Sequence, residues 1–147
     1  MKKNGLISKC LFAILVALLS SFVGSAQVAS SIELTGTSSS LSALYNVETV
    51  VDPNLVITTN GTINGFRVQI SQSYSTGDVL TYTGTLPSGI TKSWSATTGV
   101  LSFSGSGTTQ QWQDILRAVK FQSTSSVCYP TARAITFTAG TVYYALS

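Results

Sequence analysis

The sequence has no histidine among its 147 residues. Imidazole is the commonest general base and the commonest metal ligand in proteins. Its absence excludes a Ser-His-Asp triad, a thiol–imidazole pair and zinc sites with Cys/His spacing. Charged residues are also scarce, at 9% of the chain, and the five acids are far apart in sequence. The stretch "GSGTTQ" lacks the lysine of a phosphate-binding loop. We therefore expect no enzymatic activity.

Cysteine is nearly absent, with two in the chain. Cys10 falls in a segment that we expect to be removed, which leaves Cys128 in the loop "SSVCYPTA" and excludes an intramolecular disulfide. The role of Cys128 stays open between a small semi-buried side chain, a reactive thiol and an intermolecular link. The stability of the fold must then come from an apolar core.

Residues 1–26 have the composition of an export signal. A basic start is followed by the apolar run "CLFAILVALLSSFV" and by small residues up to Ala26, so cleavage would leave Gln27 as the new N-terminus. This run is shorter than the roughly 20 residues that span a bilayer. We expect a secreted or cell-surface protein with no transmembrane segment after signal removal.

Positive charge in the sequence is concentrated in this leader. Three of the eight basic residues are Lys2, Lys3 and Lys9, so the mature chain has five basic and five acidic residues and is formally neutral. A nucleic-acid-binding protein needs a dense basic face. Nucleic acid is therefore excluded as an expected partner.

After Gln27 the sequence is rich in Ser, Thr, Gly and β-branched or aromatic residues. Short alternating runs such as "GFRVQIS" are separated by the turn signals "VDPN", "TNGT", "STGD", "LPSG" and "ATTG". About seven or eight strands at this spacing predict an all-β, antiparallel sandwich. We divide the mature chain into a polar linker over 27–43, with Ile32 and Leu34 in a possible short strand, and a β-domain over 44–147. The lysine in "ITKSWS", Lys92, predicts an edge position or a strand end.

One short helix is predicted after the glycine-rich stretch. Thr108 and Gln111 form a Thr-x-x-Gln capping box. An apolar face at helical spacing follows, made by Trp112, Ile115, Leu116 and Val119. The predicted core of the domain consists of Val68, Ile70, Leu80, Tyr82, Leu101, Phe103, Trp112, Leu116, Phe121, Ile135 and Phe137.

The stretch "LPSGITKSWSATTGVLSFSG", followed by "TTQQWQDILRAVKFQSTS", resembles bacterial cadherin-like and immunoglobulin-like domains. Together with "ITFTAGTVYYALS" at 135–147, it resembles the N-terminal domain of surface adhesins that gliding bacteria export by the type IX secretion route. The resemblance implies a non-catalytic structural or adhesion module, possibly the first module of a longer protein. The partners that it implies are neighbouring domains, or a glycan or protein of a cell surface.

Two ligand classes are weighed beside this interpretation. Cadherin-like modules use acidic residues to bind Ca²⁺, which takes 6–8 oxygen ligands, so the resemblance gives Asp52, Asn60 and Asp78 as calcium candidates, against ordinary roles in turns. The alternative function is a carbohydrate-binding module whose exposed aromatics are Trp94, Tyr143 and Tyr144, against a role in the core. Solvent exposure of Trp94 distinguishes this alternative from the structural or adhesion module.

Overall fold

The computed structural model describes residues 11–19, 32–36, 41–125 and 131–140. This part of the chain is mostly β, in largely antiparallel sheets with one short helix, which confirms the all-β prediction. The strands are β1 (Leu11–Leu19), β2 (Ile32–Thr35), β3 (Leu41–Leu44), β4 (Thr49–Val50), β5 (Val56–Thr59), β6 (Gly65–Gln72), β7 (Asp78–Thr81), β8 (Ile90–Ser95), β9 (Val100–Gly105), β10 (Lys120–Ser123) and β11 (Arg133–Ala139). The helix is α1 (Thr109–Arg117).

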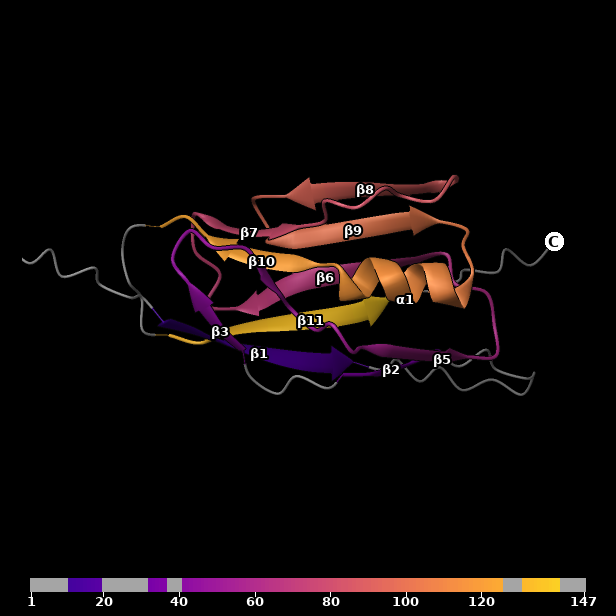
Figure 1. Ribbon diagram of the computed structural model, residues 1–147, viewed down its shortest axis with the longest axis horizontal. Coiled ribbons are helices and arrows are strands. Elements are labelled where there is room, and N and C mark those ends of the chain that lie inside the picture. The colour runs from indigo at the N-terminus through magenta and orange to yellow at the C-terminus, as the bar shows by residue number, and fades with distance from the viewer. Residues whose placement is uncertain (1–10, 20–31, 37–40, 126–130, 141–147) are drawn as a thin grey trace, which may run out of the picture.

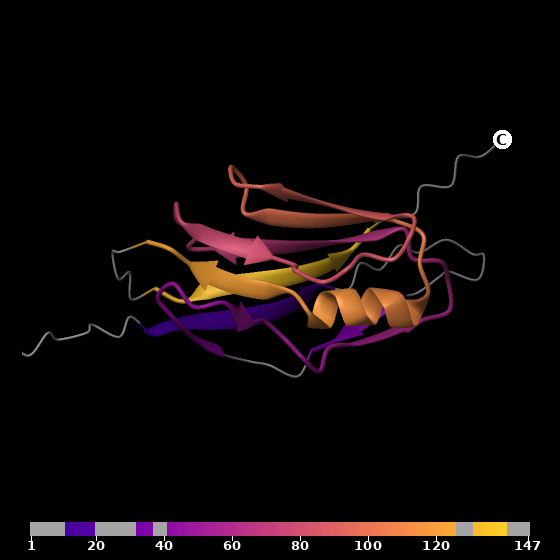
Figure 2. The ribbon, with the colours of Figure 1, turned by 45° about the horizontal axis from the view of Figure 1, so that its top comes forward.

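The strands form three sheets. The largest has six strands in the order β3-β1-β11-β6-β9-β8, the second has the order β4-β10-β7, and the third pairs β2 with β5. All pairs are antiparallel except β1 with β11, which is parallel. Figures 1 and 2 show β7, β10 and α1 lying over one face of the six-stranded sheet.

The core lies between this face and the elements that cover it. In β6 the alternating residues Phe66, Val68 and Ile70 are at most 2% exposed, whereas Arg67 is exposed. All eleven predicted core residues are buried. Period-two alternation therefore predicted which side of β6 faces the interior.

The predicted capping box starts α1. The Gln111 backbone N–H donates to Thr108 Oγ1 at 3.2 Å, and the Thr108 N–H donates to Gln111 Oε1 at 2.8 Å. The apolar helical face is buried as expected, and the Trp112 ring meets Phe66 edge-on at 5.5 Å between centroids. Helix and large sheet thus share one core.

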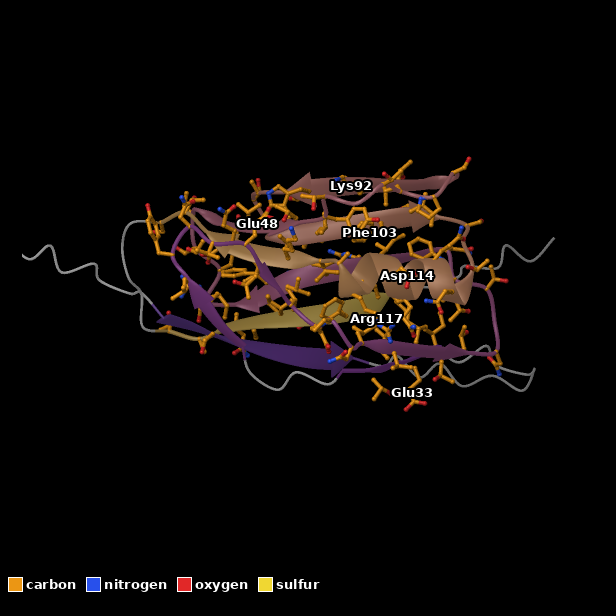
Figure 3. All side chains as sticks on the ribbon, in the orientation of Figure 1. Glu33, Glu48, Lys92, Phe103, Asp114 and Arg117 are labelled. Atoms are coloured by element: carbon orange, nitrogen blue, oxygen red, sulfur yellow. The ribbon has the colours of Figure 1, made fainter. Side chains whose placement is uncertain are left out.

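Helix α1 also completes the hydrogen bonding of β5. The Ile57 N–H donates to Gln113 Oε1 at 3.0 Å, and Arg117 Nε donates to the Leu55 carbonyl at 2.7 Å. Arg117 lies between α1 and β5 in Figure 3. Side chains of the helix therefore bond to backbone groups that a strand would otherwise use.

Two glycines shape the β8–β9 hairpin and its entry. Gly99 has φ +64°, the conformation expected from "ATTG". Gly105 has φ +136°, and a Cβ placed there would lie 1.9 Å from the Gly89 carbonyl oxygen. Only glycine fits where these two backbones meet.

Strands β1, β2 and most of β3 lie in the segments predicted as the leader, 1–26, and the linker, 27–43. Strand β1 lies wholly within the expected leader, which stays a prediction. The expected linker over 27–43 contains β2 and the first residues of β3, and Leu34 and Ala43 are buried. The described part of this stretch is therefore built into the fold rather than preceding it, because these side chains bury apolar surface in the core.

Strand β8 stands at the edge of the six-stranded sheet, as Lys92 predicted. The Lys92 ammonium donates a hydrogen bond to the Tyr82 carbonyl oxygen and lies 5.4 Å from the centre of the Tyr82 ring. In the described part of the chain α1 is nine residues long, and no helix there is long and apolar enough to cross a membrane.

Candidate functional site

The outer face of the six-stranded sheet is the polar surface that the fold assembles from four strands. Directly paired residues of neighbouring strands project to the same side. The pairs Ser93↔Ser102, Ser102↔Arg67 and Arg67↔Thr138 therefore make one row across β8, β9, β6 and β11. A second row follows from Thr91↔Ser104, and a third from Gln69↔Thr136. We call the ten outward residues the hydroxyl face: Arg67, Gln69, Ser71, Thr91, Ser93, Ser95, Ser102, Ser104, Thr136 and Thr138.

Hydrogen bonds within the hydroxyl face are few among the described residues. Ser71 Oγ lies 2.8 Å from Thr136 Oγ1 and donates to the Ala134 carbonyl at 3.2 Å. Thr91 Oγ1 donates to the Ser104 carbonyl at 3.3 Å. Ser93, Ser104 and Arg67 are exposed. Thr136 is buried, and the third row runs through the buried Val100, which pairs with both Gln69 and Ser95. The face thus presents its donors and acceptors to solvent mainly through its exposed members.

Arg67 is the one charged residue of the hydroxyl face. Neither of the two ion pairs among the described residues includes it. Beside it lies a shallow hollow of about 230 Å³, whose lining includes Asn64, Ser102 and Ser104. Gly65 also lines the hollow, and a Cβ there would lie 2.4 Å from the Phe103 carbonyl oxygen, so a larger residue would push β6 from β9. The hollow can offer hydrogen bonds and a guanidinium to a polar ligand.

A buried ion pair joins the two larger sheets. Arg133 Nε, at the start of β11, donates to Asp78 Oδ2, at the start of β7, at 3.0 Å, and both side chains are 0% exposed. Arg133 Nη1 also donates to the Thr131 carbonyl at 2.7 Å, and the Ser75 N–H donates to the same Asp78 oxygen at 3.0 Å. The sequence interpretation missed this pair. The available signal was an arginine two residues before Ile135, at an inward position of its strand.

The calcium candidates do not come together. Val50 pairs with Lys120, the first residue of β10, and Asp78 pairs with Ser123, the last, so Asp52 and Asp78 lie near opposite ends of β10. The described residues contain no group of three or more His, Cys, Asp or Glu that could hold a metal ion.

Each calcium candidate also has a local explanation. Asp52 is buried and accepts the Asn54 N–H at 3.0 Å, which is the turn-forming role. Asp78 faces the Arg133 cation, which opposes a second cation. Asn60 is an exposed residue in the bend after β5, a strand that belongs to the separate two-stranded sheet. These residues do not fit a shared Ca²⁺ site.

Of the three aromatic residues proposed for carbohydrate binding, the structure describes only Trp94. Trp94 is half-buried and packs against the core cluster, so its ring is not a freely exposed platform. Tyr143 and Tyr144 lie outside the described residues, as does Cys128. None of the three proposed aromatic residues therefore provides an exposed ring among the described residues; the exposed aromatic residue there is Tyr45, which the carbohydrate alternative did not include.

Among the residues that the structure describes, two titratable groups have shifted pKa values. The hydrogen bond from Lys120, at 2.8 Å, holds the pKa of Glu48 below its usual range. Burial raises the pKa of Tyr82, with the charge of Asp114 adding to the effect. Figure 3 shows Glu48 and Asp114 at separate places on the molecule. Neither group lies on the hydroxyl face.

Comparison with known proteins identifies no relative: no protein-family model, no curated protein and no solved structure matches this chain.

Proposed function

We propose that this chain is a non-catalytic structural and adhesive module of an exported bacterial surface protein, folded as an immunoglobulin-like or cadherin-like β-sandwich. The lack of histidine in the sequence supports the non-catalytic part. The shared core supports the sandwich, since Phe66 and Phe103 of the large sheet belong to one buried cluster with Leu80 and Phe121 of the small sheet. Such a core holds loops and neighbouring modules at fixed distances.

The observation that carries the adhesive role is the hydroxyl face. Four strands present hydroxyl and amide groups around a single guanidinium and a hollow. Sugars are recognised by the same groups, and a guanidinium adds a charge-assisted bond to a carboxylate. The partner that fits is a surface glycan that carries carboxylate groups. In this proposal the glycan contacts the sheet face rather than the aromatic residues.

Binding to immobilised glycans tests the adhesive role. The mature protein should bind a polyuronate more tightly than a neutral glucan, and added salt should weaken binding. Arg67→Gln should lower the affinity for the polyuronate about tenfold, because a hydrogen bond to a charged group contributes about 1.5–3 kcal/mol. Lys120→Gln is the matched control, since it removes one positive charge from the small sheet. Equal losses in both variants, or no preference for the polyuronate, would overturn the adhesive role.

Export is tested separately. The chain is expressed in a gliding bacterium, and the N-terminus of the surface-exposed or secreted product is read by mass spectrometry. We expect it to begin at Gln27. A product that keeps Met1 and remains inside the cell would refute export without bearing on glycan binding.

A further inference from the structure

Strand β1 fills a position in the six-stranded sheet between β3 and β11 (Figure 1). It runs parallel to β11, where Ile14–Leu19 pair with Arg133–Thr138, and antiparallel to β3, where Leu11–Ile14 pair with Leu41–Leu44. All of β1 belongs to the expected leader. Cleavage after Ala26 would remove this strand and leave its position empty.

The loss of β1 would open an edge in the middle of the fold. Six consecutive residues of β11 would lose their pairing on that side. Two of them, Ile135 and Phe137, are 0% exposed core residues. An open edge of this length favours pairing with another extended chain, and its unpaired backbone groups are costly where they are shielded from water. The mature protein therefore needs a replacement strand.

We propose that residues 142–147 fold back along β11 in the mature chain and take the place of β1, an inference that rests on the proposed removal of the leader. Strand β11 ends at Ala139, and the sequence continues "GTVYYALS". Gly140 and Thr141 would then form the two-residue loop of a β-hairpin. This loop requires Gly140 to change to a positive φ in the mature chain, because its φ is not positive while β1 is in place. An antiparallel strand with a short loop is also easier to form than a parallel strand from a distant segment.

The side-chain pattern of this segment matches the two faces of β11. With a two-residue loop, Val142 pairs with Ala139, and each later residue pairs one step further back. Tyr144 and Leu146 then stand beside Phe137 and Ile135 on the core side. Tyr143, Ala145 and Ser147 stand beside Thr138, Thr136 and Ala134 on the outer side. A slip of one residue would exchange the two sets, so the pattern selects one register.

Other segments fit the position less well. Only residues 27–31 would precede β2 in the mature chain. They are fewer than the six residues of the β11 edge, and β2 holds their end beside β5. The segment after Gly140 has the length, the attachment point and the apolar alternation. The leader and this segment would therefore compete for one edge, and leader removal would decide the outcome.

A pair of substitutions tests the register in the processed, exported protein. Tyr144→Asp places a charge on the core side and should shift the urea midpoint strongly downward. Tyr143→Asp places the same charge on the outer side and should shift it little. Similar effects of the two substitutions would overturn the proposal.

A cross-link keeps the proposal testable if Tyr144→Asp does not fold. In a Cys128→Ser background, Thr136→Cys with Ala145→Cys should form a disulfide within one chain, because directly opposed residues have suitable Cβ distances. Thr136→Cys with Tyr144→Cys is the control and should not form one efficiently. A disulfide between chains in a dimer would assign the position to a second copy. No disulfide in either variant would overturn the proposal.

Failure of this inference is distinguishable from failure of export. If mass spectrometry finds Met1 on the surface product, the leader is retained and β1 keeps its position. If the product begins at Gln27 and the cross-link does not form, export stands and the strand exchange is wrong.

Discussion

The buried pair between Arg133 and Asp78 gives the sharpest test of how this fold is held together. Arg133→Met would leave the Asp78 carboxylate with the Ser75 N–H at 3.0 Å, while its other oxygen, Oδ1, has no hydrogen-bond donor among the described residues. Removing one partner of a buried pair costs about 3–5 kcal/mol, because a desolvated charge remains. That is a large part of the roughly 5–15 kcal/mol by which domains are stable.

The measurement is urea unfolding followed by the fluorescence of Trp112, which is fully buried in α1. The control is Lys120→Met, which breaks the pair with Glu48. That pair is shorter, at 2.8 Å, but its side chains are 30% and 34% exposed. An exposed pair contributes about 0.2–1 kcal/mol. Raising the salt concentration should reduce the effect of Lys120→Met and leave that of Arg133→Met nearly unchanged.

A double variant separates the ion pair from the packing of the arginine stem. Asp78→Leu together with Arg133→Met replaces both charges by apolar side chains, so it should recover most of the stability lost in Arg133→Met. The reasoning fails if Arg133→Met costs no more than Lys120→Met. It fails equally if the double variant is no more stable than the single one.

Three further predictions concern local features of the fold. Thr108→Ala removes the N-cap of α1 and should cost about 0.5–2 kcal/mol in urea unfolding, and no loss would mean that the cap is not formed. Gly105→Ala should cost more than about 3 kcal/mol, because a Cβ would overlap the Gly89 carbonyl at 1.9 Å. Gly89→Ala, at φ +85° with 3.9 Å of space, should cost only about 1–2 kcal/mol, and equal costs would contradict the overlap. Since burial raises the pKa of Tyr82, the protonated phenol stabilises the fold fully below its unfolded pKa of about 10, and this stabilisation is lost as pH rises through the folded pKa. Urea midpoints over roughly pH 8 to 12 should fall less steeply in Tyr82→Phe, and identical slopes would refute the shift.

Local periodicity explains what could be predicted from the sequence. In "GFRVQIS" the side of each residue follows from alternation, and in α1 the buried face follows from the 3.6-residue period. Both patterns are set by neighbours in the chain. The capping box is local as well, since Thr108 and Gln111 bond to each other's backbone.

The order of the strands in the sheets could not be predicted from local sequence patterns. Arg67 and Ser93 were separately assignable to solvent-facing positions, yet their common row depends on β6, β9 and β8 being neighbours. The Arg133–Asp78 bond joins residues 55 positions apart. Asp78 was therefore weighed as a calcium ligand or a turn residue, because its partner lies on a distant strand.

The bonds from Gln113 and Arg117 to the backbone of β5 have a consequence for self-association. A peptide that tried to extend the two-stranded sheet at β5 would have to displace the Gln113 amide and the Arg117 guanidinium, which both belong to α1. Because Trp112 ties that helix to the interior, peeling it away would require disrupting the centre of the molecule. Cross-β stacking through this strand is thereby blocked. We therefore expect copies of this chain at high concentration not to pair with one another through β5.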